Sequence, residues 1–505
     1  MRTVPGRSEH VVVVGAGLAG LSAALHLLGA GRRVTLVERE QRPGGRMGRL
    51  DRGGFRIDTG PTVLTMPGLI DEALGAVGAS LTDAVTLHRL DPAYRARFAD
   101  GSSIDVHTDA DAMEQEVRDK VGESDAAGYR QLRAWLTAMY TAEIGRFIGS
   151  NFDSPLDMVG SPAALRDLTQ FVRLGGLSSL SGKVGSFIRD ERLRRVFTFQ
   201  SLYAGVSPSE ARAAYGVIAY MDTVAGVYFP EGGMHTVAQA MADAAVNAGA
   251  ELRLGTSVSS LEISGSRVRA VCTAEGDRIT CDAAVLTPDL PLVDELLGRV
   301  HRRMPATRWA PSAVVLHGGI SSAVTAGWPE PAHHTIDFGR AWNQTFTEII
   351  AGGKAGRGLL MSDPSLLITR PSLTDPSLAP PGQELCYILA PCPNLHTAAL
   401  DWDQLGSAYR DELLGVLHTR GYTGIEELTV HELVTPAGWA AQGMAAGTPF
   451  SAAHTMTQTG PFRRRNMLPG LENAVLAGCG TTPGVGVPTA VISGRLAAQR
   501  VVGAR

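Results

Sequence analysis

The sequence predicts an α/β fold built around a parallel sheet, and three observations lead to this prediction. A run of four valines, Val11 to Val14, leads directly into the loop Gly15-x-Gly17-x-x-Gly20. A helical pattern follows, and a second strand over residues 33–37 ends at the acidic residue Glu38. Near the other end of the chain, residues 473–480 read as a strand that enters a turn rich in glycine and proline. Strands that alternate with helices are typical of parallel sheets.

The glycine loop, with its flanking strand and helix, has the order of a dinucleotide-binding βαβ unit. Gly15 allows the chain to turn sharply out of the strand, Gly17 lets the backbone approach a pyrophosphate, and Gly20 lets the helix pack closely on the sheet. The start of the helix points free N–H groups and its positive dipole end at the phosphates. We therefore predict dinucleotide contacts from Gly15, Ala16, Gly17, Leu18, Ala19 and Gly20.

An acidic residue and a glycine pair extend this predicted site. Glu38 lies eighteen residues after the last glycine of the loop, where a carboxylate accepts hydrogen bonds from a ribose diol. The same carboxylate would repel a 2′-phosphate, which disfavours NADP. Gly44 and Gly45 free the backbone for close approach, and the forked guanidinium of Arg46 suits a diphosphate. These residues, with Arg39 beside the acid, are predicted cofactor contacts.

The first apolar stretch has an alternative interpretation. Residues 11–31 carry no charge except a possible one on His26, so hydropathy alone would admit a membrane span or a signal peptide. A run of valines followed by three glycines at fixed spacing is poor helix material, and an ordered strand follows at once. We therefore expect a strand and helix of a globular domain.

The late strand leads into a second predicted site. Residues 481–488 form a turn with glycine and proline, and a helix is expected from about Val487 to Arg500. The positive end of this helix would face an anion or an electron-rich ring. A simple strand–helix corner is the alternative, although the turn has more glycine and proline than a corner needs. Predicted contacts from this turn are Gly478, Gly480, Gly486 and Val487.

Composition excludes several classes of function. The chain has 505 residues and a net charge of −4, so no overall field favours nucleic acid. The five cysteines are scattered without a Cys-x-x-Cys pair, which predicts neither a disulfide framework nor a zinc site and fits a reducing cytoplasm. His333 and His334 are adjacent on an expected strand and would point to opposite faces, so we predict no metal site.

The first resemblance concerns the cofactor. The pattern Glu38-x-x-x-x-Pro43-Gly44-Gly45-Arg46 and the string Asp58-Thr-Gly60-Pro61 resemble the two-dinucleotide-binding flavoproteins related to amine oxidases. The resemblance implies non-covalent FAD and a late turn that faces the flavin ring. No second Gly-x-Gly-x-x-Gly follows a strand, as a separate nicotinamide domain would require. The resemblance adds Gly60, Pro61, Thr62 and Val258 to the predicted cofactor contacts.

Further strings resemble the bacterial phytoene desaturases of carotenoid synthesis, and this resemblance spans nearly the whole chain. They are residues 188–202, 228–234, 332–335, 374–380 and 478–488. Cys479 and Thr482 stand where the family usually has alanine and histidine. The resemblance implies hydride transfer to flavin N5 from allylic carbon–carbon bonds of phytoene, giving lycopene or partly desaturated intermediates. Oxygen or a quinone would accept the electrons, and no catalytic residue is assigned.

Two other activities share the nucleotide motifs. A flavin amine oxidase usually needs an aromatic cage beside the flavin, and only 6% of this chain is aromatic, with no cage that can be placed. A carotene cis–trans isomerase would use reduced FAD without net oxidation. The strings in the middle of the chain favour the desaturase over both alternatives.

A polyene of about forty carbons resides in lipid, because each methylene gains about 0.8 kcal/mol on leaving water. Residues 161–200 carry seven basic and three acidic side chains with leucines between them. This pattern predicts an amphipathic surface on an anionic membrane, with an ordinary lid helix as the alternative. We expect a cytoplasmic protein that associates peripherally with a membrane.

The predicted architecture is therefore a Rossmann-type FAD-binding domain built from discontinuous segments, an antiparallel-sheet substrate domain and a helical lid or membrane-associating subdomain. The FAD-binding domain is expected to take three segments, 1–80, 226–290 and 466–505, with a strand over residues 283–286 in the second. The substrate domain would take the strands of 81–108 and the long segment 291–465, where short strands and loops alternate with one helix near residues 403–418. The helical lid would span residues 109–225.

Overall fold

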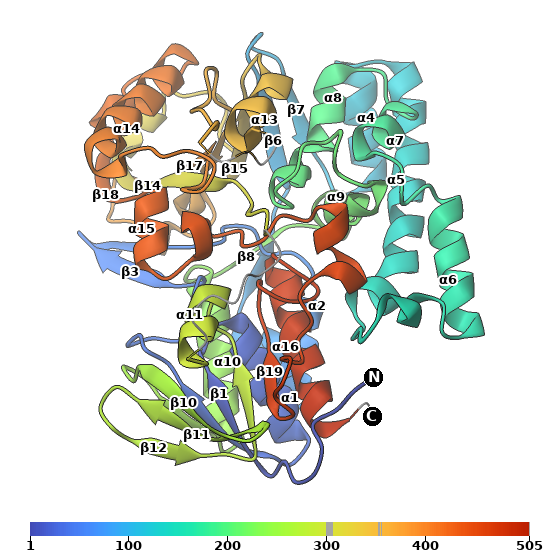
Figure 1. Cartoon of the computed structure of the whole chain (residues 1–505). Coiled ribbons are helices and arrows are strands. Elements are labelled where there is room, and N and C mark those ends of the chain that lie inside the picture. The colour runs from blue at the N-terminus through green and yellow to red at the C-terminus, as the bar shows by residue number, and fades with distance from the viewer. Residues whose placement is uncertain (299–306, 352–353, 355, 504–505) are drawn as a thin grey trace.

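A computed structural model describes the chain except for residues 299–306, 352–353, 355 and 504–505, which fall within the predicted segments 291–465 and 466–505. Figure 1 shows a lower region that holds the parallel sheet and both termini, with a second sheet and a group of helices above it. The fold is a mixed α/β fold with parallel and antiparallel sheets, as expected.

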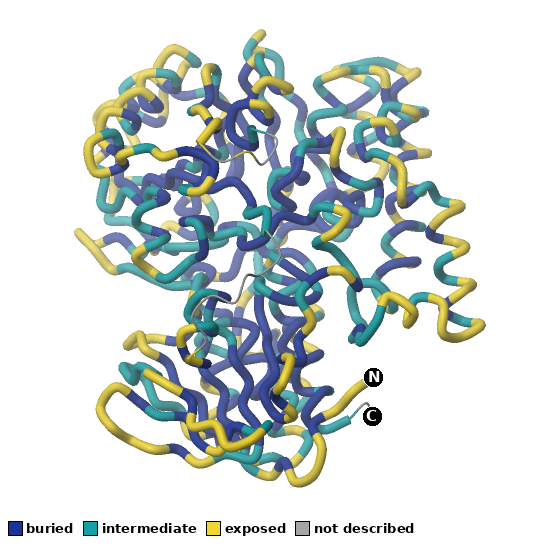
Figure 2. The backbone as a smooth tube through the Cα atoms, viewed as in Figure 1, coloured by how far each residue is buried: buried dark blue, intermediate teal, exposed yellow. Residues whose placement is uncertain are grey.

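Five strands from distant regions of the chain form the parallel sheet. Their order is β19 (Ala474–Leu476), β13 (Ala283–Leu286), β1 (His10–Val14), β2 (Arg33–Val37) and β9 (Glu251–Arg253). Val11, Val12 and Val13 are fully buried, because a parallel sheet is covered on both faces. These strands form the dark blue centre of the lower region in Figure 2.

Helices cover one face of this sheet, and a small antiparallel sheet covers the other. The helices are α1 (Leu18–Gly29), α2 (Gly68–Gly75), α10 (His235–Asn247) and α16 (Val487–Val502). Gly494 allows α16 to approach α1, since a Cβ there would lie 2.2 Å from the Ala19 carbonyl oxygen. On the other face, Val12 and Val14 pack with residues of β10 (Val258–Ser264) and β11 (Arg267–Thr273), which pairs with β12 (Arg278–Thr280).

The second sheet has seven strands and lies above the first (Figure 1). In order these are β18 (Thr429–Val434), β14 (Ser312–Ser321), β17 (Gln383–Cys392), β16 (Leu366–Thr369), β15 (His334–Phe338), β6 (Tyr94–Phe98) and β7 (Ser103–Val106). All neighbours are antiparallel except β6 and β15. Two separate antiparallel pairs also form, the hairpin of β3 (Arg49–Arg52) with β4 (Phe55–Asp58), and the long-range pair of β5 (Leu87–Arg89) with β8 (Tyr228–Pro230).

The region of residues 109–225 is helical, as the pattern predicts. Its main helices are α4 (Ala110–Lys120), α5 (Glu123–Glu143), α6 (Pro162–Arg173), α7 (Leu180–Gly185), α8 (Glu191–Val196) and α9 (Gly216–Tyr220). Within the described residues of the chain, no helix is both long and apolar enough to cross a membrane.

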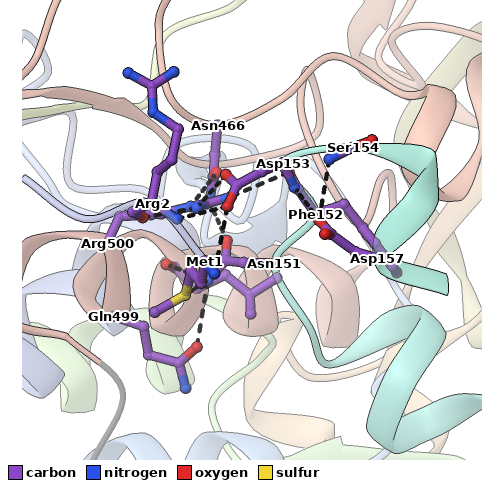
Figure 3. Close-up of polar contacts among 11 residues, drawn as sticks. Met1, Arg2, Asn151, Phe152, Asp153, Ser154, Asp157, Asn466, Gln499 and Arg500 are labelled. Atoms are coloured by element: carbon purple, nitrogen blue, oxygen red, sulfur yellow. Dashed lines mark hydrogen bonds and ion pairs between the residues drawn. The ribbon is translucent and has the colours of Figure 1, made fainter. Parts of the chain in front are cut away.

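A buried arginine joins this helical region to both chain termini (Figure 3). The Arg500 guanidinium on α16 pairs with Asp153 at 2.6 Å and donates to the carbonyl oxygens of Arg2 and Phe152 at 2.7 and 3.1 Å. Its Nε donates to Asn466 at 2.9 Å. Because a buried charge is retained only when it is paired and hydrogen-bonded, this cluster fixes residues 152–153 against the end of α16.

The structure corrects four sequence expectations. Residues 81–84 form the short helix α3 (Leu81–Ala84) instead of a strand. The segment 291–465 contains the predicted helix α14 (Trp402–Thr419), but it also contains helices that were not predicted. These are α13 (Trp342–Ile350) and the shorter α12 (Ser322–Thr325) and α15 (Pro436–Ala441), with α11 (Leu290–Leu296) beginning just before the segment. The local pattern does not predict α13, because aromatic residues have weak helix propensity. This helix is stabilised by the burial of Trp342 and Phe346 in the tertiary structure.

The third and fourth corrections concern side-chain directions. His333 precedes β15, so strand alternation does not apply to it, and its ring lies 4.5 Å from that of His334. In residues 161–200, Arg194 donates inward to the Ile188 carbonyl at 2.7 Å and Arg195 to the Gly339 carbonyl at 2.7 Å. Fewer basic side chains are therefore available for a surface than the seven counted in the sequence, because these two bind carbonyl oxygens within the fold.

Candidate active site

The carboxyl ends of the parallel strands meet at one large cavity. Gly15 follows β1, Glu38 follows β2, Thr287 follows β13, and Gly478 lies two residues after β19. All four residues line a single cavity of about 1320 Å³. Ligands in open parallel sheets bind outside the carboxyl ends of the strands, where the strand order reverses. In this sheet β2 pairs with one edge of β1 and β13 with the other, so the strand order reverses at β1 and a crevice forms there.

Most of the predicted cofactor residues line this cavity. They are Gly15, Gly17, Leu18, Ala19, Glu38, Arg39, Gly44, Gly45, Arg46, Gly60, Pro61, Thr62, Val258, Gly478, Gly486 and Val487. Ala16, Gly20 and Gly480 are not in its wall. A Cβ on Gly20 would lie 2.0 Å from the Gly15 carbonyl oxygen, and one on Gly480 would lie 2.9 Å from Leu290. These two glycines therefore allow close packing behind the wall.

Glycines bring two loops together at the cavity. The Gly44 N–H donates to the Ala16 carbonyl at 2.8 Å, and Gly17 and Gly44 form an isolated parallel bridge. A Cβ on Gly45 would lie 3.1 Å from the Gly17 Cα, and one on Gly60 would lie 1.6 Å from the Arg46 carbonyl oxygen. The wall at this point is backbone, which leaves N–H groups accessible to a ligand.

Glu38 is buried at the edge of the cavity and organises the glycine loop. Its Oε2 accepts a hydrogen bond from the Ala16 N–H at 2.7 Å, and its Oε1 accepts one from the Glu40 N–H at 3.0 Å. A carboxylate has about four acceptor positions, so positions remain for hydroxyl donors from a ligand.

Arg46 has one partner and one unused donor. Its guanidinium pairs with the Asp289 carboxylate at 2.5 Å, whereas its buried Nε has no hydrogen-bond partner among the described residues. Burial disfavours the charged form, but Asp289 and Cys479 outweigh this and raise the pKa of Arg46 above its usual value. Sequence reasoning missed Asp289, although its position three residues after a predicted strand of the parallel sheet is the signal that would have found it.

Asp58 belongs to one of the predicted motifs but has a structural role. Its carboxylate accepts from the backbone N–H groups of Met234 and His235 at 2.7 and 3.0 Å, at the start of α10. Burial raises the pKa of Asp58 to about 6, although both hydrogen bonds favour the charged form. This residue therefore fixes α10 relative to the Gly60 turn without lining the cavity.

The far half of the cavity is apolar and was not predicted. The wall includes side chains from the seven-stranded sheet and from the helical region, among them Ala313, Val315, Leu367, Leu389, Met444 and Met221. Aromatic side chains also converge here, namely Phe147, Phe171, Tyr203, Tyr215, Tyr387, Trp439, Phe450 and Phe462. Since these residues come from separate segments of the chain, no local pattern brings them together.

Two buried carboxyl groups lie in this half. Glu143 ends α5, and Asp222 follows α9. Glu143 Oε1 and Asp222 Oδ2 have no hydrogen-bond partner among the described residues. Burial raises the pKa of Asp222 to about 7 and raises the pKa of Glu143 well above its usual value. Burial thus favours the neutral form of both groups, and Asp222, whose pKa lies near neutrality, exists in both forms at neutral pH.

The two ends of the cavity differ in polarity. Near Glu38 the wall reaches solvent at Arg39, Glu40, Gln41 and Arg42, which are exposed. The wall also includes Leu177, Met456 and Phe462, which are exposed apolar residues. The first group of exposed residues therefore suits a charged ligand, and the second an apolar one.

The residues fit a dinucleotide with an attached ring. The helices α1 and α16 both begin at the cavity without a side-chain cap, so their first N–H groups are available to an anion or an electron-rich ring. The unused Arg46 Nε adds a cationic donor. Across the described residues, no group of three or more His, Cys, Asp or Glu side chains is arranged to hold a metal ion.

Comparisons with known proteins agree with this fit. The family model "Flavin containing amine oxidoreductase" matches residues 18–502. The chain is 60% identical to a phytoene dehydrogenase of Streptomyces griseus over 100% of this chain and 97% of that protein. It is 33% identical to a zeta-carotene-forming phytoene desaturase of Myxococcus xanthus over 98% and 94% of the two chains.

A solved oxidoreductase from Methanosarcina mazei shares the fold, with a TM-score of 0.60, 16% identity, and coverage of 96% of this chain and 99% of that one. The family match confirms the predicted flavin cofactor. The chain therefore belongs to the flavin-containing amine oxidoreductase family and, within it, to the group of the bacterial phytoene desaturases.

Proposed function

We propose that this chain is an FAD-dependent carotenoid desaturase that acts on phytoene and forms lycopene or partly desaturated intermediates. The relative with 60% identity carries phytoene in its name. The observation that carries the proposal is the single cavity, whose wall combines charged residues at the parallel sheet with apolar residues of the seven-stranded sheet and the helical region. Its volume of about 1320 Å³ exceeds the range of about 300–1,000 Å³ that is usual for one ligand.

FAD would be held without a covalent bond by the predicted residues of the cavity wall. Gly15 and Gly17, with the start of α1, would bind the pyrophosphate, and Glu38 would accept hydrogen bonds from the ribose. The partly exposed Arg46 guanidinium, which lines the cavity, would contribute a cationic donor to the phosphates. The turn of residues 478–487 would face the flavin ring. Ala16, Gly20 and Gly480 would support this arrangement from behind the wall.

The apolar half of the cavity would hold the polyene in a dry environment. Val315, Leu367 and Leu389 contribute apolar side chains to the wall from the seven-stranded sheet, and Met221 and Phe450 contribute theirs from other segments. FAD, when bound, supplies the two-electron oxidant that takes a hydride from an allylic carbon. Exclusion of water protects the charge that develops on the polyene.

Each desaturation also releases a proton from the neighbouring carbon. Asp222 is the buried carboxyl of the cavity whose pKa lies near 7, where a general base is most effective. Its Oδ2 has no partner among the described residues. We assign proton acceptance to the Asp222 carboxylate, which lines the cavity. Burial favours the neutral form of Glu143, which would serve as a wall residue.

The part of the molecule that carries the exposed apolar wall residues would lie on a lipid bilayer. Leu156 and Leu165 are 72% and 54% exposed, and both lie in the helical region that contributes Phe171 and Leu177 to the cavity. A polyene would enter from lipid without crossing water. This orientation fits a cytoplasmic, peripherally associated protein whose electrons pass to oxygen or to a membrane quinone.

The six-segment domain division belongs to the same proposal. Residues 1–80, 226–290 and 466–505 would form the FAD-binding domain, and 81–108 with 291–465 the substrate domain. Residues 109–225 would form the lid on the membrane. The strand positions support this division, because the parallel sheet takes strands from the first group and the seven-stranded sheet from the second.

The proposed reaction is tested by expressing the chain in cells that accumulate phytoene and analysing the extracted carotenoids. We expect phytoene to be consumed and coloured products with longer polyenes to appear. Unchanged phytoene in cells that contain folded, flavin-loaded protein would contradict the proposal. A change in double-bond geometry without hydrogen loss would indicate the isomerase instead.

Arg46→Ala should weaken FAD binding about 10- to 100-fold, because a hydrogen bond to a charged group contributes about 1.5–3 kcal/mol. The measurement is the Kd from a flavin fluorescence titration of apoprotein. Arg278→Ala is the control, since Arg278 pairs with Glu262 on the surface of the small sheet. Equal FAD affinity of the two variants would remove Arg46 from the phosphate site. Apoprotein stability is recorded in parallel because Asp289 loses its partner.

Asp222→Asn should lower the rate about 100-fold or more, as expected for loss of a general base. In the parent protein the rate should rise with pH through about 7, because only the carboxylate form accepts a proton. The variant should lose this rise. Glu143→Gln is the matched control, and its profile should keep the midpoint near pH 7 because Asp222, the group that titrates there, is unchanged in this variant. The same pH profile in both variants would refute the assignment.

Leu156→Glu combined with Leu165→Glu should weaken binding to vesicles of phosphatidylcholine and phosphatidylglycerol at least about tenfold, since burial of a leucine contributes about 1.5–3 kcal/mol. Co-sedimentation measures the effect. Ile263→Glu is the control, because this 38% exposed residue lies on the small sheet in the lower region of the molecule (Figure 1). If all three proteins bind vesicles alike, the proposed membrane surface is wrong.

A further inference from the structure

Arg463 is a buried arginine directly behind the turn that begins at Gly478. It is only 3% exposed, and its guanidinium bonds to backbone alone among the described residues. Nε donates to the Thr481 carbonyl at 3.0 Å and Nη2 to the Cys479 carbonyl at 2.7 Å. Nη1 donates to the carbonyls of Ala452 and Gln458 at 3.3 and 3.2 Å. The side chain thus connects the stretch of residues 452–463 to the turn at residues 479–481 around one cation.

No carboxylate balances this charge within the residues that the structure describes. Arg463 forms no ion pair there, unlike its neighbour Arg464, which pairs with Asp294 at 3.3 Å. Burial lowers the pKa of Arg463, but an arginine in a protein stays protonated. A buried charge without a counter-ion is costly, and carbonyl dipoles offset only a fraction of that cost.

The cavity lies on the other side of the same turn. Cys479, whose carbonyl Arg463 binds, lines the cavity, as do Thr482 and Pro483. His454 also lines it, and its pKa is lowered well below the usual value by burial and by Arg463, so its imidazole is neutral. Arg463 is therefore the source of positive charge behind this stretch of the wall.

We propose that Arg463 is a positioning residue that holds the flavin-facing turn and raises the reduction potential of the bound flavin. This inference rests on the proposed function, which brings the flavin ring to residues 478–487. Reduction adds negative charge to the ring, and an uncompensated cation behind a thin wall of low dielectric stabilises that charge. Arg463 has no counter-ion among the described residues, and the negative charge that forms on the flavin during turnover would supply one.

The inference is tested by measuring the midpoint potential of the flavin in the holoprotein and in three variants. Arg463→Gln should lower the equilibrium constant for reduction at least tenfold, which is about 30 mV for a two-electron couple. Arg463→Lys keeps the charge and should retain most of the potential. Arg464→Gln is the matched control, since Asp294 already offsets that charge, and its potential should equal that of the parent.

A purely structural role for Arg463 predicts a different result. It would lower apoprotein stability in Arg463→Gln and leave the potential of any bound flavin unchanged, which would overturn the inference. If Arg463→Gln does not fold, the midpoint potential of the flavin in the parent protein is compared with that of free FAD in the same buffer. The inference requires the bound flavin to have the higher potential, and a lower one would overturn it. Failure to bind any flavin would instead refute the proposed function, and this inference with it.

Discussion

The close approach of backbone to backbone at the carboxyl edge of the parallel sheet is the constraint on which the site depends. Gly44, Gly45 and Gly60 each occupy a place where a Cβ would lie within 3.1 Å of other backbone atoms. Because this wall has no side chains, two uncapped helix starts can present N–H groups to the cavity. Glu38, Arg46 and Asp289 then supply charge at the edge of a surface that is otherwise neutral backbone.

The cavity brings two incompatible solvation requirements together. A dinucleotide needs charged and polar partners, whereas a long polyene needs an apolar channel that excludes water. The molecule separates them by architecture, because the parallel sheet supplies the first set of residues and the seven-stranded sheet with the helical region supplies the second. Burial in the apolar half shifts the pKa of Asp222 upward, so the same dry environment that suits the polyene also tunes the carboxyl group.

Local sequence patterns predicted the elements around the glycine loops with little error. Helix α16 begins at Val487, as the turn chemistry indicates, and β1, β2 and β13 have nearly the expected bounds. Short helices in the segment 291–465 were missed, because helices such as α13 depend on tertiary packing of aromatic residues. The basic surface over residues 161–200 was overestimated, because Arg194 and Arg195 reach inward to carbonyl oxygens.

The sequence by itself determined the parallel sheet, the nucleotide loops and the cofactor class. These depend on spacing within short segments, where glycine, β-branched residues and a single acid have fixed physical roles. Only the tertiary structure decided that Asp289 pairs with Arg46, that Asp222 and Glu143 share one cavity, and that Arg463 has no counter-ion among the described residues. The reason is that ion pairing, desolvation and the electrostatic field depend on which distant segments meet in space. The number of residues between two charges in the sequence does not reveal the dielectric around either of them.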